Sequence, residues 1–337
     1  QIKVGVIGYG GAFNMGRAHL SQMQAAGMTP VAVSDLDKDR LKVAEDEFPG
    51  IATYTSVTTM LKKSDVNLIV IITPHNTHAK LALQCLRAGK HVVCEKPLAI
   101  TTAECDRMIK EAKKQDVVLS TYHNRHWDGC ILTAVKQIVD KGVIGDVYRV
   151  DCTLGNYGQP GDWWRSSKSI SGGILYDWGV HLLEYCLQIV QDDVTEVSGY
   201  AHTGFWAAKS KWKDDVNEDE AFAVVRFKSG AWLTLKNSHL SAAPNPGWVT
   251  FHGTKGAYFM SHQGHEIILP KANGGETIRK NPNTASRGQE FYQNIADHLV
   301  KDAELIITPE WSRRPIHILD LADKSATAGK AMKAKYA

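Results

Sequence analysis

Short apolar runs alternate with longer amphipathic segments along the first third of the chain. The runs are of strand length and rich in Val and Ile, as expected of parallel strands buried on both faces. They lie at 2–7, 31–34, 68–72, 92–94 and 117–120. The segments between them have helical spacing and lie at 15–26, 37–47, 75–88 and 101–114. This alternation predicts an α/β fold with a doubly wound parallel sheet.

After Trp127 the pattern becomes that of a mixed α+β domain. Runs at 221–227 and 231–235 around the turn Lys-Ser-Gly predict a β-hairpin. The other expected segments are an amphipathic one at 131–139, a strand at 147–155, a loop at 156–173, a helix after Gly173, mostly strands from 195 to about 268, a polar loop at 271–286 and mostly helix at 310–333.

The predicted hairpin carries apolar side chains on both of its faces. Phe222 and Val224 lie on one face, and Val225 and Phe227 lie on the other. One face can pack on the helices of its own domain, and the other needs a second cover. A subunit partner is the simplest cover, so we expect a homodimer or homotetramer formed through the C-terminal sheet.

The length of 337 residues exceeds what one hydrophobic core usually holds. We therefore expect two domains, at 1–124 and 125–337.

A net charge of +3, with scattered Lys and Arg, argues against nucleic acid as a partner. No apolar window reaches the roughly 18 to 20 residues that span a bilayer, and no signal peptide is expected in the chain as given. Six single cysteines without a CxxC pair favour a reduced, cytoplasmic protein.

A glycine-rich loop, GYGGAFNMG at 8–16, follows the first predicted strand. Glycines allow the backbone to approach a pyrophosphate at the start of the next helix. Asp35, at the end of the second strand, can accept hydrogen bonds from both ribose hydroxyls and would repel a 2′-phosphate, which favours NAD over NADP. Phe13 stands where the fingerprint has its third glycine, a role that Gly16 can take. The expected cofactor contacts here are Gly8, Gly10, Gly11, Ala12, Phe13 and Asp35; a turn without ligand and an ordinary helix-capping Asp35 are the alternatives.

Three more polar clusters follow predicted strands: TPHNTH at 73–78, EKP at 95–97 and TYHNRHW at 121–127. The carboxyl ends of parallel strands share one sheet edge, where ligands bind. We therefore expect Thr73, Pro74, Asn76, His78 and Glu95 near the cofactor. Helix capping is the alternative for Thr73, Asn76 and His78, and orientation of Lys96 is the alternative for Glu95.

Asp177 and His181 lie four residues apart on the helix after Gly173, hence on one helical face. A carboxylate beside an imidazole holds its tautomer and raises its basicity, as a general base requires. Gly172 and Gly173 would let another segment or a substrate come close. An ordinary surface pair is the alternative.

These motifs resemble, in the same order, those of the glucose–fructose oxidoreductase, inositol dehydrogenase and rhizopine-catabolism family (Gfo/Idh/MocA). The resemblance rests on GVIGYGG, Asp35, TPHNTH, EKP, YHNR, DWWR and GGILYDWGVH, and spans nearly the whole chain. It implies an N-terminal Rossmann domain, a C-terminal domain with an open, mostly antiparallel sheet, and an NAD(P)-dependent oxidation or reduction of a sugar or cyclitol. His126 departs from the members that act on inositols, where an arginine is common.

The resemblance also implies roles for single residues. Lys96, Asp177 and His181 would form the catalytic group. The substrate site would add Tyr122, Arg125 and Trp164, and the cofactor site would add Lys96, Asn124, Trp164 and Arg165. His181 would take the hydroxyl proton while Lys96 donates a hydrogen bond to the same oxygen.

Three other functions remain open at this point. A metal site could use His75, His78, His123, His126 and His181, but hydride transfer needs no ion and we expect no metal. An NAD-dependent glycosidase, which oxidises its substrate only transiently, would keep the same lysine. A non-catalytic sensor of NAD and sugar is the third, and the intact catalytic group argues against it.

Overall fold

The computed structural model describes residues 1–243 and 248–335, and the chain forms two compact units. The first unit combines residues 1–124 with residues 289–316. The second combines residues 125–288 with the chain from His317 onward. The second unit is thus interrupted by a segment that packs with the first, while the division into domains at 1–124 and 125–337 stays a prediction.

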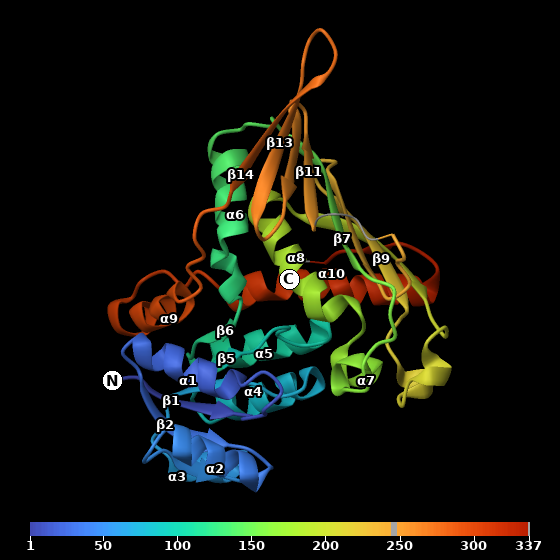
Figure 1. The fold of residues 1–337 in the computed structure, drawn as a ribbon. Helices are drawn as coiled ribbons and strands as arrows, with labels where there is room; N and C mark the ends of the chain where they lie inside the picture. The colour runs from blue at the N-terminus through green and yellow to red at the C-terminus, as the bar shows by residue number, and fades with distance from the viewer. Residues whose placement is uncertain (244–247, 336–337) are drawn as a thin grey trace. The chain divides into compact units, whose positions relative to one another are not determined.

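The first unit is built on a six-stranded parallel sheet with the strand order β3-β2-β1-β4-β5-β6 (Figure 1). Its strands are β1 (Lys3–Ile7), β2 (Thr29–Ser34), β3 (Ala52–Tyr54), β4 (Leu68–Ile71), β5 (His91–Cys94) and β6 (Leu119–Thr121). Its helices are α1 (Met15–Ala25), α2 (Lys38–Glu47), α3 (Val57–Lys63), η1 (His75–Thr77), α4 (His78–Arg87), α5 (Thr102–Gln115) and α9 (Glu290–Lys301). This is the predicted Rossmann sheet, with β4 lying beside β1 at the switch point where such folds bind ligands.

Three elements of this unit, β3, α3 and α9, were not predicted, and the first two are short. β3 has three residues, all half-buried, and α3 has seven, of which Met60 is the buried one. Neither is long enough to show a hydrophobic period, and both are held by the sheet edge to which β3 pairs.

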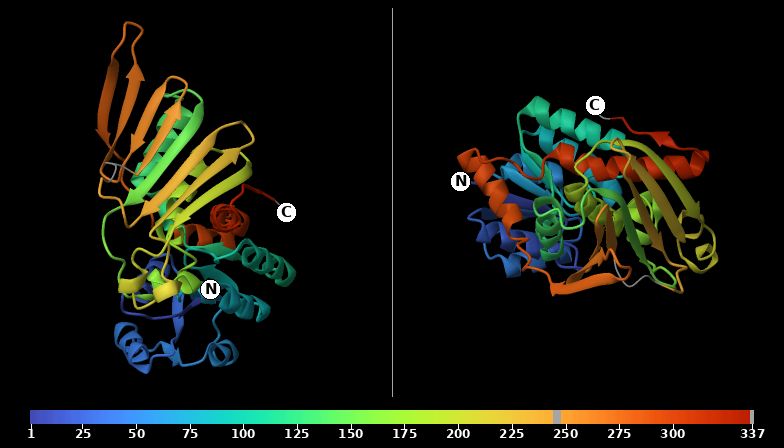
Figure 2. Two further views of the ribbon diagram at one scale, coloured as in Figure 1. Left: turned by 90° about the vertical axis from the view of Figure 1, so that its right-hand side faces the viewer. Right: turned by 90° about the horizontal axis from the view of Figure 1, so that it is seen from above.

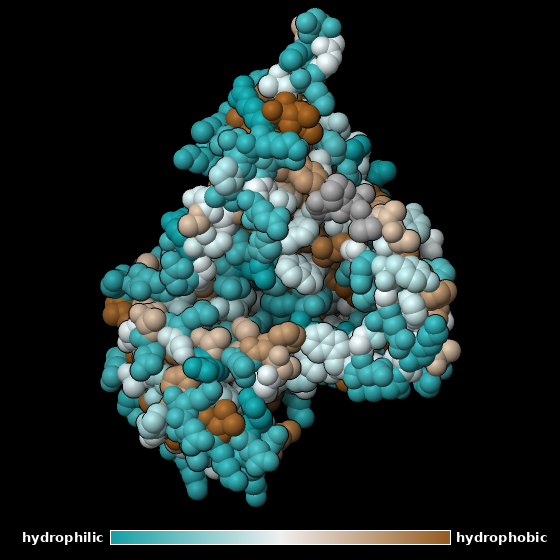
Figure 3. Space-filling model, viewed as in Figure 1, coloured by the Kyte–Doolittle hydropathy of each residue, from teal (hydrophilic) through white to brown (hydrophobic). Residues whose placement is uncertain are grey.

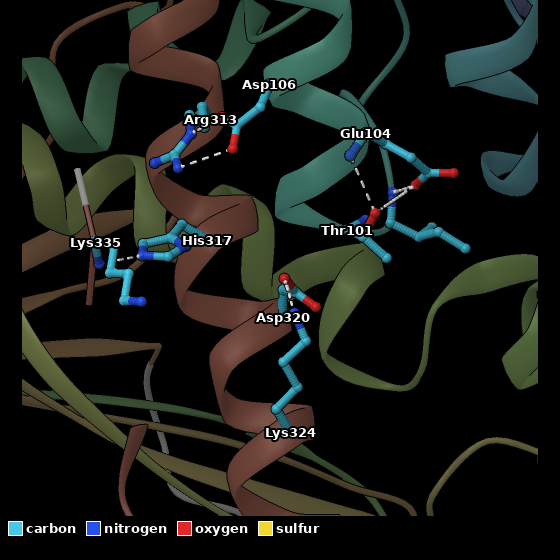
Figure 4. Close-up of polar contacts among 9 residues, drawn as sticks. Thr101, Glu104, Asp106, Arg313, His317, Asp320, Lys324 and Lys335 are labelled. Carbon is cyan, nitrogen blue, oxygen red and sulfur yellow. Dashed lines mark hydrogen bonds and ion pairs between the residues drawn. The ribbon is translucent and has the colours of Figure 1, made fainter. Parts of the chain in front are cut away.

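Side-chain bonds fix the N-terminal part of α5. Thr101 and Glu104 form a capping box at its start, in which each side chain bonds the backbone of the other residue (Figure 4). One turn into the helix, Asp106 accepts a hydrogen bond of 2.5 Å from Nε of Arg313. The Arg313 side chain is 10% exposed, so this ion pair ties the 289–316 segment to the sheet's own helices.

The second unit is built on a nine-stranded sheet of order β14-β13-β12-β11-β7-β10-β9-β8-β15, in which only β7 and β10 pair in parallel. Its strands are β7 (Val147–Gly155), β8 (Val194–His202), β9 (Glu220–Phe227), β10 (Trp232–Ser238), β11 (Val249–Gly253), β12 (Gly256–Met260), β13 (Gly264–Pro270), β14 (Glu276–Pro282) and β15 (Met332–Lys333). Its helical segments are η2 (Asn124–Trp127, which begins at the unit boundary), α6 (Gly129–Ala134), η3 (Val135–Asp140), η4 (Trp164–Ser166), α7 (Lys168–Ser171), α8 (Leu175–Ile189), η5 (Ala207–Lys209), η6 (Lys213–Asp215) and α10 (Pro309–Ala328, which begins in the first unit). The open, mostly antiparallel sheet agrees with the predicted fold class.

The predicted hairpin is present as β9 and β10, which pair antiparallel with Arg226 opposite Trp232 at one end and Glu220 opposite Ser238 at the other. The predicted polar loop at 271–286 is wrong, because β14 pairs along the whole of β13. Five of the seven residues of β14 are polar or charged and it lies at the sheet edge, so no apolar alternation marks it in the sequence. The predicted helix at 310–333 ends at Ala328 and is followed by the short strand β15.

One face of the large sheet is covered by helices α6 and α8, which lie behind the strands in the left view of Figure 2. Val225, Leu233 and Leu235 point to this face and are fully buried. Phe222 and Val224 lie on the opposite face and are half-buried. The surface in the view of Figure 3 is mostly hydrophilic, with apolar residues in small groups.

Candidate active site

The glycine loop between β1 and α1 approaches its neighbours too closely for side chains at two positions. Gly8 has φ of 95°, and a Cβ there would lie 2.5 Å from the carbonyl oxygen of Ile72. A Cβ on Gly16 would lie 2.4 Å from the ring of Tyr9. Gly16 thus gives the close contact between helix and strand for which the dinucleotide fingerprint uses its third glycine.

The same loop leaves open space where a ligand would approach the backbone. A Cβ on Gly10 would meet no atom within 4 Å. Phe13 is 55% exposed at the tip of the loop, and Ala12 beside it is exposed as well. Because backbone amides here precede the N-terminus of α1, the loop fits a pyrophosphate.

Asp35 lies at the carboxyl end of β2 and faces the glycine loop. Its carboxylate accepts hydrogen bonds from the backbone N–H of Tyr9, at 2.6 Å, and of Asp37, at 2.9 Å. Each carboxylate oxygen keeps a further acceptor site, as contacts to ribose hydroxyls require. The residues present therefore fit the adenosine half of a dinucleotide.

Arg40 is a residue of this region that we did not predict. Its Nε donates a hydrogen bond of 2.7 Å to the carbonyl of Tyr9, and its guanidinium lies 2.8 Å from the position of a Cβ on Gly11. A guanidinium near the ribose is the group that accommodates a 2′-phosphate in NADP enzymes. Its position five residues after Asp35, in the first turn of α2, was the available sequence signal.

The segment after β4 contains one exposed and one fully enclosed candidate. Asn76 is exposed, and Thr73 bonds the hydroxyl of Thr77 at 2.6 Å. His78 is fully buried, and its two ring nitrogens lie 2.8 Å from the carbonyl oxygens of Pro97 and Thr73. Burial lowers the pKa of His78, and the two carbonyls oppose that shift. His78 thus links this segment, next to Pro74, to the EKP segment.

Glu95 and Lys96 follow β5, and the Lys96–Pro97 peptide bond is cis. The Glu95 carboxylate accepts a hydrogen bond of 2.8 Å from the backbone N–H of Lys96 and lies 3.1 Å from Nε2 of His19. Burial raises the pKa of Glu95, but these bonds and the charge of Lys96 outweigh it, so the pKa lies below its ordinary value. Lys96 itself is half-buried.

Tyr122, expected at the substrate, lies within the first unit and is 3% exposed. Its hydroxyl donates a hydrogen bond of 2.6 Å to Gln22, and its ring stacks on Tyr292. Asn124 follows at the end of this unit and is half-buried.

In the second unit, Asp177 and Arg165 form an ion pair at the start of α8. Nη1 of Arg165 donates to the Asp177 carboxylate, and the guanidinium lies 5.2 Å from the ring centres of both Trp163 and Trp164. The Asp177 side chain remains 34% exposed. Arg165, Trp164 and Asp177, which the resemblance groups together, therefore do lie together.

The double glycine before α8 allows a carboxylate to approach its first turn. A Cβ on Gly173 would lie 2.9 Å from the Glu218 carboxylate, which accepts a hydrogen bond of 2.9 Å from the N–H of Ile174. Glu218 is buried and pairs with Lys168 at 2.7 Å. This anion at the N-terminus of α8 fixes the helix that carries Asp177 and His181.

His181 is 6% exposed and lies one turn below Asp177 on α8. The ring of Trp178 contacts it edge-on, with centres 5.7 Å apart, and Arg125 lies 4.9 Å from the Trp178 ring centre. Arg125 is held in turn by Asp128, at 3.0 Å. The second unit thus brings Arg125 and His181 to one aromatic side chain, Trp178.

Known proteins resemble this chain in sequence and in fold. Residues 2–123 match the profile of an oxidoreductase family with an NAD-binding Rossmann fold, and residues 132–259 match that of the GFO/IDH/MocA C-terminal domain. Myo-inositol 2-dehydrogenase of Thermotoga maritima is 32% identical over 263 residues, which are 77% of this chain and 75% of that protein. The chain belongs to the Gfo/Idh/MocA oxidoreductase family.

Two further proteins are similar to this chain. The NADP-dependent scyllo-inositol 2-dehydrogenase of Bacillus subtilis is 28% identical over 189 residues, 56% of this chain and 51% of that protein. The structure of an NAD-binding protein from Listeria innocua has a TM-score of 0.83 at 25% identity, over 99% of this chain and 97% of that one. These findings confirm the family, the fold class and an oxidoreductase with an NAD-binding Rossmann domain.

His126, which departs from the pattern expected of inositol-specific members, is paired with a buried carboxylate. Nδ1 of His126 lies 2.5 Å from the carboxylate of Glu184, which is buried on α8 and also accepts from Gln188. A buried glutamate thus holds the His126 ring.

One group of potential metal ligands occurs among the described residues. Ligand atoms of Asp128, Cys130 and His262 all lie within 4.8 Å of one another. Asp128 already accepts hydrogen bonds from Arg125 and Tyr185, and burial raises the pKa of Cys130 to about 11, which disfavours a thiolate. This donor set does not fit a metal ion.

None of the helices in the described residues is long and apolar enough to span a bilayer.

Proposed function

We propose that this oxidoreductase oxidises a secondary hydroxyl of a sugar or a cyclitol, with NAD as the hydride acceptor. The observation that carries the proposal is the position of Lys96, at the carboxyl end of β5 in a Rossmann sheet whose glycine loop and Asp35 fit a dinucleotide. The similarity to a myo-inositol 2-dehydrogenase supports the substrate class.

NAD, when bound, supplies the acceptor for the hydride that leaves the carbinol carbon. His181 takes the hydroxyl proton, and in the reverse direction returns it. Asp177 supports the charge that His181 gains, while Arg165 pairs with the Asp177 carboxylate and orients it. These three groups are supplied by α8 and the preceding loop.

Lys96 donates a hydrogen bond to the reacting oxygen and stabilises its alkoxide character. In this proposal Lys96 and His181 act on the same oxygen. Glu95 holds the backbone from which Lys96 extends.

We propose NAD rather than NADP because Asp35 places a carboxylate at the ribose position. Arg40 would favour NADP instead, because its guanidinium lies against the same loop and can accommodate a 2′-phosphate. Thr73, Pro74, Asn76, Glu95 and Asn124 are proposed as the remaining contacts to NAD.

The proposed substrate is a neutral polyhydroxylated ring. Arg125, Trp164, Asp177 and His181 provide donors, acceptors and an aromatic surface, as sugar sites do. Tyr122 would act through its backbone or by packing, because its hydroxyl is engaged by Gln22.

A screen of neutral sugars, inositols and sugar acids by NADH absorbance tests the proposal, with NADP run in parallel. We expect NADH formation with at least one inositol or neutral sugar and a preference for NAD. Release of a leaving group without net NADH would indicate the glycosidase instead. NAD binding without turnover of any compound would indicate a sensor, and preference for NADP would contradict the role of Asp35.

A further inference from the structure

A chain of buried polar groups leads from helix α9 to the residue before Lys96. The hydroxyl of Tyr292 lies 2.5 Å from Nδ1 of His19, and Nε2 of His19 lies 3.1 Å from Oε1 of Glu95. Oε2 of Glu95 accepts the backbone N–H of Lys96 at 2.8 Å. Tyr292 and His19 are fully buried, and all four residues belong to the first unit.

The direction of each hydrogen bond follows from the chemistry of the groups. An ionised carboxylate only accepts, so Nε2 of His19 carries a hydrogen and donates a hydrogen bond to Glu95. In a neutral imidazole the other nitrogen is then an acceptor, which makes the Tyr292 hydroxyl the donor to Nδ1. When His19 is neutral, Tyr292 therefore selects the tautomer of the ring that can hold Glu95.

The ring of His19 is also held from its sides. Tyr122 contacts it edge-on, with ring centres 4.3 Å apart, and Tyr122 stacks on Tyr292 at 5.5 Å. His19 therefore has little freedom to turn away from Glu95. Because both carboxylate oxygens of Glu95 are bonded within the protein, this residue orients the main chain at Lys96.

We propose that His19 and Tyr292 are positioning residues for Lys96, acting through Glu95. The inference rests on the proposed function, since the group positioned is the lysine that would bond the reacting oxygen. Tyr292 lies outside both segments that match the family profiles, and the return of the 289–316 segment to the first unit supplies it. A residue almost 200 positions away in sequence thereby fixes the end of β5.

Three variants of the full-length enzyme test this role: Tyr292→Phe, His19→Leu and His19→Gln. Tyr292→Phe removes one hydroxyl and keeps the buried ring. His19→Leu removes the donor to Glu95, whereas the amide of His19→Gln can still donate. We expect kcat to fall roughly 3- to 30-fold in the first two, with KM for the polyol and Kd for NAD nearly unchanged, and partial recovery in His19→Gln.

A second readout does not depend on turnover. Lys96 is acetylated with an N-hydroxysuccinimide ester, and the modified peptide is quantified by mass spectrometry relative to Lys80, which is exposed on α4. We expect Lys96 to react several-fold faster in Tyr292→Phe and His19→Leu, because its backbone is held less firmly. Tyr258→Phe is the matched control: Tyr258 is fully buried, and its hydroxyl has no hydrogen-bond partner among the described residues.

The outcomes separate the two claims. Unchanged kcat and unchanged Lys96 labelling in Tyr292→Phe would overturn the positioning role. A lower melting temperature with normal kcat and labelling would do the same, since it would show a purely structural contact. Altered labelling in a protein that oxidises no polyol would support the positioning role and overturn the proposed function.

Discussion

Lys96 is the residue on which the proposed chemistry depends most directly. It extends from a backbone that Glu95 holds from within the protein, and it lies where the parallel sheet opens toward ligands. In the proposed mechanism, the ammonium group of Lys96 interacts most strongly with the substrate oxygen when negative charge develops on that oxygen.

Lys96→Met should lower kcat by about 10² to 10³-fold, the loss typical of a donor to a developing oxyanion. NAD affinity should change little, because the glycine loop and Asp35 are untouched. Steady-state kinetics and NAD titration by fluorescence measure both quantities. Lys80→Met, an exposed lysine on α4, is the control; an unchanged kcat in Lys96→Met would remove the lysine from the mechanism.

Glu95 should make stability depend on pH in one direction. Its pKa in the folded protein lies below the ordinary value of 4.5, so its ionised form stabilises the fold above that pH, and the contribution is lost as the pH falls through the folded pKa. Glu95→Gln should therefore melt below the wild type at pH 7, and the gap should narrow below about pH 4.5. Melting curves at several pH values would contradict this if the gap widened in acid.

Residues whose chemistry shows in local spacing were predictable. Asp35 directly follows an apolar run, Lys96 follows one after Glu95, and Asp177 and His181 stand four apart on a helix. His19 gave a weaker signal as a polar residue on the buried stripe of α1. Tyr292 gave none, because its contact with residue 19 depends on the chain's return to the first unit.

At the scale of elements, the turn from β1 into α1 uses its glycines for two different purposes. Gly16 is required by packing against Tyr9, whereas Gly10 borders open space. The first purpose concerns folding and the second concerns a ligand.

Gly16→Ala should lower stability by about 1 to 3 kcal/mol, because the added methyl overlaps the fully buried Tyr9 ring. Gly10→Ala should leave stability nearly unchanged and weaken NAD binding. Denaturant unfolding and NAD titration distinguish them. Equal stability losses in the two variants would contradict this division of roles.

Elements were predictable where an apolar period was long enough to be seen. The buried strands and α8 follow from such periods, and so does the β9–β10 hairpin. β14 was missed because an edge strand with six exposed residues resembles a polar loop. Its strand character comes from pairing with β13, which is a property of the neighbour.

At the scale of the whole molecule, the uncovered face of the large sheet remains the proposed oligomer interface. Trp232 is 38% exposed on this face, and its ring centre lies 6.0 Å from that of Tyr148, which is 43% exposed. Half-buried Phe222 and Val224 extend the same face. Exposed aromatic side chains are enriched in interfaces.

Sedimentation should therefore show a dimer or tetramer at micromolar concentration. Trp232→Glu should shift the protein toward monomers, because it places a charge in the apolar part of the interface. Val300→Glu, at a residue 66% exposed on α9, should not. A monomeric wild type would refute the interface.

The central claim of the proposed function is that Lys96 and His181 act on one oxygen in one step. The most direct measurement is kcat/KM of Lys96→Met, of His181→Asn and of the double variant, with NAD and the polyol identified by screening. Residues that act as a unit have non-additive effects. We predict that the double variant is no more than about threefold slower than the slower single variant; losses that multiply would show that the two residues serve separate steps.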